Sequence, residues 1–336
     1  MRKEKKETRL VAVENEVQGY HEGGWNSSTN YAFLGYKNNL YFTSDRTIKL
    51  DNEFRPLDKN GCLDEKKILK GFGLEIELEC WGINNQEALT QVLKNICMKD
   101  LPCDLFKYQR DGSLRGGNSS IEAITQVMTK EFIRNNYPNF KQMYELFKTF
   151  DISASRSGNC GMHVNMSNGL FGKDKKTQID AIRKLIYIVN KHYDMMCVLV
   201  KRDSSRTGYC SRMYNFTNKD YAKKFDLETL GIESNSNHNI CFNYAHFGKG
   251  RVELRLVGGQ KDYYTLRNTM ECIFHLVGRV KDISWDNCDS LTEIFKGCNK
   301  YVIKRLDDVK NAGLMDMATY NEIVANSDNE TDFGNF

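Results

Sequence analysis

The segment Gly71–Cys80, GFGLEIELEC, constrains the fold more than any other stretch of the chain. Apolar residues at Leu74, Ile76 and Leu78 alternate with acidic ones. A period of two is that of a β-strand, whose successive side chains point to opposite faces of a sheet. We therefore expect a strand with one face on a hydrophobic core. Its other face carries three carboxylates in a row, namely Glu75, Glu77 and Glu79.

A row of unpaired carboxylates repels itself, and a bound cation removes that repulsion. Ligand sets made only of oxygen atoms suit Mg²⁺ or Mn²⁺. The acidic face of this strand is thus a candidate metal site. The alternative interpretation is a strand face that is simply solvated.

Two further segments show the same alternation. In residues 162–166, His163 and Asn165 share one face, and in residues 251–256 the polar face carries Arg251, Glu253 and Arg255. If all three strands lie in one sheet, their polar side chains share one surface and helices cover the apolar side. Carboxylates and arginines on one surface fit phosphate chemistry, because they bind metal and stabilise charge on a phosphoryl group.

Each of these residues also has a simpler interpretation. Taken singly, His163 would be a hydrogen-bonded structural histidine, and Glu253 would be a salt-bridged residue of a strand face. Their joint occurrence on strands of period two is what favours a site.

The remaining segments predict the other elements of an α+β fold. Apolar residues at helical spacing predict helices at several places along the chain: after Asn84 or Asn85, from about Pro138, over about 175–200, over about 262–281, and one or two within 291–324. Residues 239–246 and 250–257 are expected to form a hairpin, and residues 31–36 and 40–43 are expected to form either a small hairpin region or an extension packed on the main domain. Helices between strands, with two hairpins, predict a mostly antiparallel sheet.

Composition excludes several classes of function. The net charge of the 336 residues is +4 with both signs mixed, and no basic stripe with exposed aromatics indicates a nucleic-acid partner. No apolar run is long enough to span a membrane, and the N-terminus does not resemble a signal peptide. The eleven cysteines lack zinc-site spacing, which favours free, mostly buried thiols and a cytoplasmic location. No P-loop motif occurs.

Five motifs in order carry a resemblance to a known family. They are GFGLEIE, DGSL followed by a glutamate, GMHVN, SRTGYC in an Arg-rich segment, and RVELRLVGG. Together they resemble the amidoligase family, which is similar in fold to glutamine synthetase and glutamate–cysteine ligase; GMHVN with VELR is the most specific part. The resemblance covers roughly residues 70–285. We therefore expect an N-terminal β-rich extension over 1–66, a catalytic domain over 67–285, and a C-terminal helical extension with a frayed tail over 286–336.

The resemblance implies ATP-dependent joining of a carboxylate to an amine. ATP would phosphorylate the carboxylate, and the amine would attack the acyl phosphate, on a curved antiparallel sheet with a polar active-site face and helices on the other face. The implied cofactors are ATP and Mg²⁺ or Mn²⁺. The substrates would be a small-molecule or peptide carboxylate and an amine, and the protein could form a homo-oligomer.

The family's metal ligands fall on five residues of this chain: Glu75, Glu77, Glu122, His163 and Glu253. The resemblance implies that Glu75, His163 and Glu253 hold one metal, and that Glu77 and Glu122 hold a second. Catalytic roles fall on Glu253, Arg255 and Arg206. ATP contacts are expected from four arginines: Arg206, Arg212, Arg251 and Arg255.

Several residues keep more than one interpretation. Asp111 could replace or join Glu122, or be a turn residue before a glycine. Asn165 stands where the family more usually has histidine, which puts its role in doubt. For Arg202 and Arg212, a phosphate contact and a solvated loop position are equal alternatives. Two competing functions also stay open, a phosphotransferase on the same scaffold and a catalytically inactive relative that serves as a binding or structural protein.

Overall fold

The computed structural model describes a large part of the chain, divided into two compact units. The described residues are 32–34, 39–102, 104–109, 114, 119–155, 160–203, 210–227 and 239–328. Unit 1 comprises Met1–Asp64, Gly73–Met162 and Gly259–Tyr263, and unit 2 comprises Glu65–Phe72, His163–Gly258 and Tyr264–Phe336. The expected division into 1–66, 67–285 and 286–336 stays a prediction. Asp111, Arg206 and the residues after 328 lie outside the described part.

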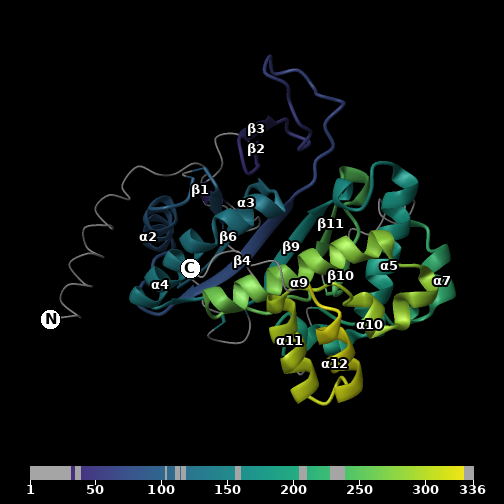
Figure 1. Cartoon of the computed structure of the whole chain (residues 1–336). Coiled ribbons are helices and arrows are strands. Elements are labelled where there is room, and N and C mark those ends of the chain that lie inside the picture. Colours follow the sequence, from purple (N-terminus) through teal and green to yellow (C-terminus); the bar gives the residue numbers. More distant parts are fainter. Residues whose placement is uncertain are drawn as a thin grey trace. The chain divides into compact units, whose positions relative to one another are not determined.

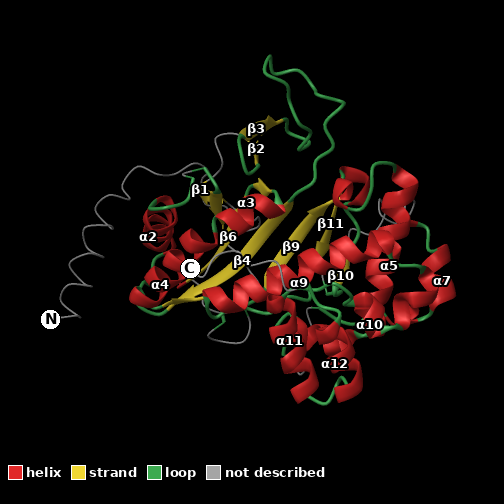
Figure 2. Cartoon of the chain, viewed as in Figure 1, coloured by secondary structure: helices red, strands yellow, loops and turns green. Residues whose placement is uncertain are grey.

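Unit 1 is built on a β-sheet, whose strands are yellow in Figure 2. The strands are β1 (Ala32–Leu34), β2 (Asn39–Phe42), β3 (Thr47–Leu50), β4 (Phe72–Cys80), β5 (Phe106–Gln109), β6 (Ser120–Thr125), β7 (Val127–Met128) and β8 (Ile152–Ser153). Their order is β1-β5-β6-β4-β7-β2-β3, and β8 pairs with β4. The pairs β1–β5, β5–β6, β6–β4, β4–β8 and β2–β3 are antiparallel, while β2–β7 is parallel. The prediction of a mostly antiparallel sheet is therefore confirmed here.

The central strand β4 forms for the reason that its sequence indicates. Its apolar side chains Leu74, Ile76 and Leu78 are almost fully buried. Burying each such side chain contributes about 1.5–3 kcal/mol to the free energy of unfolding. A shift of one residue in register would turn these three side chains to the other face, so the register of β4 is strongly specified.

Of the two interpretations offered for residues 31–36 and 40–43, a hairpin between the two segments is wrong for the strands that the structure describes. β1 pairs with β5, and β2 pairs instead with the following strand, β3. The reason is a tight turn after β2, where the Thr43 hydroxyl accepts from the Arg46 backbone N–H at 3.1 Å and donates to the Asp45 carboxylate at 2.8 Å. A side chain that bonds its own neighbouring backbone favours such turns and makes the next segment the partner strand.

The helices that the structure describes in unit 1 are labelled in Figure 1. They are α2 (Gln86–Met98), α3 (Lys130–Asn135) and α4 (Tyr137–Thr149). The Asn85 side chain accepts from the Ala88 N–H at 3.0 Å and so caps α2 where the sequence predicts its start. The expected inward faces of α2 and α4 are buried, including Leu93 and Phe140.

The strands that the structure describes in unit 2 are short. They are β9 (Met162–Ser167), β10 (Phe242–Asn243) and β11 (Arg251–Leu254). β9 begins at Met162, the last residue of that part of unit 1. β11 is antiparallel to both β9 and β10, and Asn165 lies directly opposite Glu253. The hairpin β10–β11 is the predicted one with shorter strands; its turn ends at Gly250, whose φ of 85° suits a residue without Cβ.

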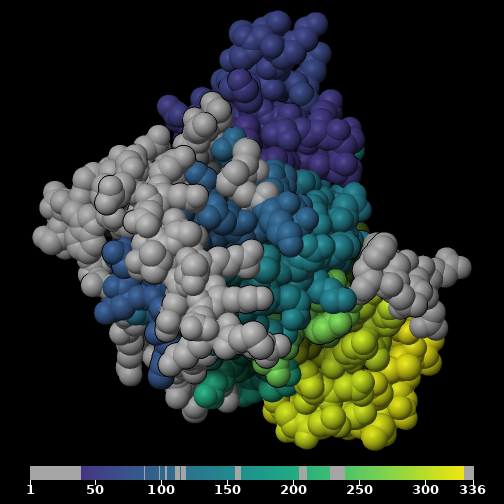
Figure 3. Space-filling view, turned by 90° about the vertical axis from the view of Figure 1, so that its left-hand side faces the viewer, coloured from purple at the N-terminus to yellow at the C-terminus, as the bar shows by residue number. Residues whose placement is uncertain are grey.

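Helices make up most of unit 2. They are α5 (Lys175–Lys191), α6 (Tyr193–Leu199), α7 (Lys219–Lys224), α9 (Tyr263–Asp282), α10 (Leu291–Ile294), α11 (Lys300–Asn311) and α12 (Met317–Ala325). The predicted inward face of α9 is buried, from Leu266 to Val277. The C-terminal helices α11 and α12 contact each other and gather in the yellow region of Figure 3. Strands with helices in both units confirm the mixed, α+β character of the chain.

The single helix predicted over 175–200 is wrong, because the chain breaks between α5 and α6 at His192. The carbonyl oxygens of Asn190 and Lys191, which would bond the next turn of an unbroken helix, instead accept from the Arg212 guanidinium at 2.8 and 3.2 Å. A partner from outside the helix thus satisfies the carbonyls that α5 leaves unpaired at its end. Sequence periodicity alone does not reveal such a partner.

Two expectations from composition can be compared with the structure. The ten cysteines among the described residues are free thiols, and all but Cys62 are buried, as expected. Across the same described part, no helix combines the length and the apolar character that crossing a membrane requires.

Candidate metal centre

The acidic residues of β4 occupy a protected part of unit 1. Glu77 and Glu79 are 6% and 3% exposed, and Glu75 is half-buried. In the antiparallel pair with β6, Glu77 lies directly opposite Glu122, and Glu79 lies opposite Ser120. Two carboxylates directly opposite each other on neighbouring strands repel unless a cation, a proton or hydrogen-bond donors compensate them. The interpretation of a simply solvated acidic face does not fit this burial.

Glu77 is held by the backbone that leads into β9. Its own N–H donates to the Gly161 carbonyl oxygen at 3.2 Å, and the Gly161 N–H donates in return to the Glu77 carboxylate. A hydrogen bond from a backbone N–H stabilises the charged form of a carboxylate and fixes its direction. Glu77 therefore has a structural partner of its own in unit 1.

Glu122 is held by a residue that sequence reasoning missed. The Gln109 side-chain amide, on the neighbouring strand β5, donates to Glu122 Oε2 at 2.9 Å, and the two residues are paired in register. Gln109 can be identified only from the register between β5 and β6, which places it opposite Glu122. The alternation of side chains within each strand does not reveal that register.

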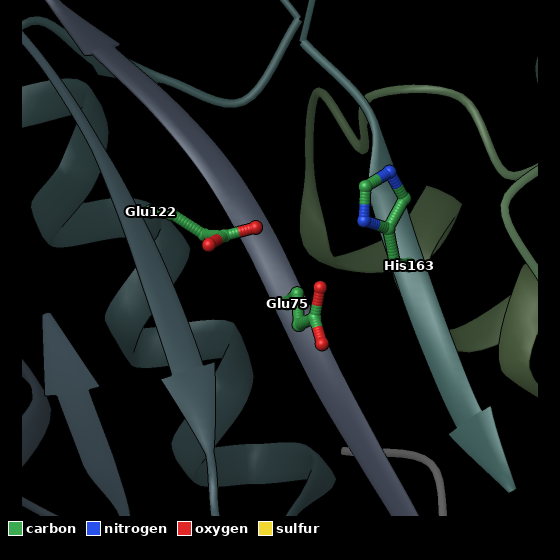
Figure 4. Close-up of side chains that lie close together, drawn as sticks. All are labelled: Glu75, Glu122 and His163. Atoms are coloured by element: carbon green, nitrogen blue, oxygen red, sulfur yellow. The ribbon is translucent and has the colours of Figure 1, made fainter. Parts of the chain in front are cut away.

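One group of side chains could hold a metal ion, as Figure 4 shows. Glu75, Glu122 and His163 each offer one ligand atom, and these three atoms lie within 4.8 Å of one another. His163 is the second residue of β9 and follows directly on Met162 of unit 1. The two carboxylate oxygens suit Mg²⁺ and Mn²⁺, and an imidazole nitrogen is a ligand for divalent transition metals. The donor set thus fits the metal that the resemblance implies.

Unit 2 contains a second cluster, centred on Glu253 of β11. Its Oε1 accepts from the Arg255 guanidinium at 2.6 Å, and its Oε2 accepts from the Asn243 amide at 2.9 Å. Oε1 also lies 3.4 Å from Nδ1 of His163. Glu253 is 6% exposed, so this carboxylate is held inside the protein by charged and polar neighbours. Asn243 was not predicted, although its place on the expected hairpin, opposite Glu253, could have revealed it.

The contact with Glu253 bears on how the His163 ring is held. A carboxylate beside a ring nitrogen of a histidine ligand commonly fixes the ring and its tautomer. The Glu253 carboxylate, 3.4 Å from Nδ1 of His163, is placed to do this. The geometry therefore suits Glu253 to orienting His163 at least as well as to binding metal itself.

Arg255 combines one strong contact with an unpaired group. Its Nη1 donates to Glu253, while its buried Nε has no hydrogen-bond partner among the residues that the structure describes. An unsatisfied buried donor costs free energy, so its retention calls for a reason such as an anionic ligand that it contacts.

The other predicted arginines lie in different surroundings. Arg212 donates to the carbonyl groups at the end of α5 and stacks between Tyr193 and Tyr214, at 6.0 and 5.6 Å from the ring centroids. Arg251 is half-buried on β11, opposite Ser167. Arg202 donates to three backbone carbonyl groups of the described residues, which a simply solvated loop residue would not do, and its predicted phosphate contact stays a prediction.

A comparison with protein-family models finds no match for this chain, and a comparison with curated proteins finds none either. What the protein does must therefore be inferred from the chemistry of its own side chains.

Proposed function

We propose that this protein is an ATP-dependent carboxylate–amine ligase, with a catalytic fold like that of glutamine synthetase. The proposal rests above all on the buried group of Glu75, Glu122 and His163, because two carboxylates and an imidazole fit the divalent cation that accompanies ATP. The order of the sequence motifs, from GFGLEIE to RVELRLVGG, gives further support.

In this proposal Glu75, Glu122 and His163 would hold Mg²⁺ or Mn²⁺. A metal there would supply positive charge against the phosphate oxygens of ATP. Glu253 would orient His163 and Arg255 through the two contacts of its Oε1 atom. Glu77, which the sequence assigns to a second metal, keeps this role as a prediction.

The proposed reaction has two steps. An oxygen of the acceptor carboxylate attacks the γ-phosphorus of ATP, the bond to the β,γ-bridging oxygen breaks, and ADP leaves. The amine nitrogen then attacks the acyl carbon and loses a proton, and phosphate leaves with the oxygen that came from the carboxylate. Arg255 would contact the phosphoryl group, where a planar guanidinium can stabilise the charge on two oxygens at once.

The proposed cellular compartment is the cytoplasm. ATP and Mg²⁺ are both available in the cytoplasm, and free buried thiols fit a reducing compartment. The acceptor carboxylate and the amine would be small molecules or peptides.

The test of this function is incubation of the protein with Mg·ATP and pooled amino acids and short peptides, followed by mass spectrometry. A ligase turns over ATP repeatedly only when an amine consumes the acyl phosphate, and its product has the summed mass of two substrates less one water. A phosphorylated substrate that accumulates over many turnovers without an amine would identify a phosphotransferase instead. No ADP and no new mass under any condition would contradict both enzymes and favour an inactive relative.

The contact between Gln109 and Glu122 leads to a prediction about metal affinity. Replacing Gln109 with leucine should weaken Mn²⁺ binding about tenfold, because partners that orient a metal ligand typically contribute this much. Calorimetric titration of the purified protein with Mn²⁺ measures the change. Gln91→Leu is the matched control, since the Gln91 amide donates to Asn95 on the same helix, α2, and not to a candidate ligand. Equal Mn²⁺ affinity in the two variants would show that Glu122 is not a ligand.

A further inference from the structure

Arg202 binds the backbone at the end of β11. Its guanidinium donates to three consecutive carbonyl oxygens, those of Arg255 at 3.1 Å, Leu256 at 3.2 Å and Val257 at 3.0 Å. All of these residues belong to unit 2. Hydrogen bonds from a charged donor are stronger than those between neutral groups. These three bonds, which we call the Arg202 clamp, therefore hold the backbone of residues 255–257 firmly.

The same segment is fixed from its other sides. The Arg255 N–H donates to the Cys241 carbonyl oxygen at 2.9 Å, and the Gly258 N–H donates to the Val200 carbonyl oxygen at 3.0 Å. Gly258 packs so closely that a Cβ built on it would lie 1.9 Å from the Lys201 carbonyl oxygen. The backbone on both sides of the Arg255 side chain is thus held in one position, with Arg202 as the charged part of the clamp.

This clamp has a consequence for the Arg255 side chain. The short strand β11 ends at Leu254, so regular strand pairing does not extend to Arg255. Its guanidinium must nevertheless stay 2.6 Å from Glu253. A group that acts on a phosphoryl oxygen has to be held within a fraction of an ångström of its working position.

We propose that Arg202 is a positioning residue, which fixes the backbone from Arg255 to Val257 and so holds the Arg255 guanidinium in place. Its catalytic consequence rests on the proposed function, but the positioning itself does not. Arg202 touches neither substrate nor metal in this account, and it acts only through Arg255.

The experiment compares Arg202→Gln with Arg279→Gln in full-length protein labelled with ¹⁵N-arginine. Arg279 is the matched control, because its guanidinium also donates to a backbone carbonyl group of unit 2, that of Glu293 at 2.8 Å. The NMR signal of the buried Arg255 Nε–H is assigned by its loss in Arg255→Lys. We expect Arg202→Gln to broaden or shift this signal, and Arg279→Gln to leave it in place.

A steady-state assay of the same proteins gives the second readout. We expect kcat of Arg202→Gln to fall about 10–100-fold with the KM for ATP nearly unchanged, because a displaced catalytic group slows the chemical step. Arg202→Lys, which can still reach one carbonyl oxygen, should show a smaller loss and serves if the glutamine variant does not fold. An unchanged Arg255 signal overturns the proposal, and so does a normal kcat in an active enzyme. If the wild-type protein has no ligase activity, the proposed function fails, while the NMR comparison still decides the positioning.

Discussion

Replacing Arg255 with lysine is expected to lower the rate of turnover about 10²–10³-fold, which is the typical loss when one preorganised donor to developing charge is removed. Lysine keeps the positive charge beside Glu253, so it can replace arginine in the ion pair, which is 2.6 Å long in the structure. What lysine lacks is the planar fork that can contact two phosphoryl oxygens together. Lysine also lacks any group that could replace the buried Nε–H of Arg255.

The rate has to be measured beside the melting temperature. An unchanged melting temperature with a strongly reduced rate supports a role of Arg255 on the phosphoryl group. A near-normal rate would show that Arg255 only pairs with Glu253 and would contradict the catalytic assignment. Arg255→Gln, which loses the charge as well, should then be less stable, because it leaves the buried Glu253 carboxylate without its cation.

Replacing Gly258 with alanine is expected to destabilise the protein by about 1–3 kcal/mol, the usual cost of an added methyl group in a fully packed place. The new Cβ would lie 1.9 Å from the Lys201 carbonyl oxygen, 2.5 Å from its carbonyl carbon and 2.9 Å from the Arg202 nitrogen. All three are backbone atoms, so no side chain can rotate away to make room. The turn that carries Arg202 must move instead.

Gly278 provides the control for this substitution. It lies within α9, and a Cβ built on it meets nothing within 4 Å. Alanine there should raise the free energy of unfolding by about 0.5–1 kcal/mol, because glycine has a large conformational entropy when unfolded. Urea denaturation of both variants gives the two free energies. Effects of the same sign at Gly258 and Gly278 would contradict the close packing at Gly258.

The sequence predicts local structure well where a single period governs a segment. The burial of Leu74, Ile76 and Leu78 on β4 and the inward face of α9 both follow from spacing alone. The predictions fail where a distant partner decides the outcome. Arg212 ends α5 at a place that periodicity does not mark, and the turn at Thr43 gives β2 a different partner from the one expected.

The residues of the candidate site divide in the same way, into those that sequence motifs identify and those that only distant contacts reveal. Glu75, Glu122 and His163 were named from the sequence, and the structure brings their ligand atoms together. Gln109 could not be named, because its contact with Glu122 depends on the register between two strands. The contacts of Arg202 depend on a turn and a strand end more than 50 residues apart, and no pattern within either segment indicates them.

The most direct test of the proposed function follows an oxygen atom. The protein is incubated with Mg·ATP and the amino acid and peptide pool, whose carboxyl groups carry ¹⁸O, and the released phosphate is analysed by mass spectrometry. An acyl-phosphate intermediate predicts that each phosphate formed with an amide carries one ¹⁸O atom, since the carboxylate oxygen leaves with phosphorus. Phosphate without ¹⁸O, alongside ADP release, would mean that water and not a carboxylate attacks ATP, and would contradict the ligase.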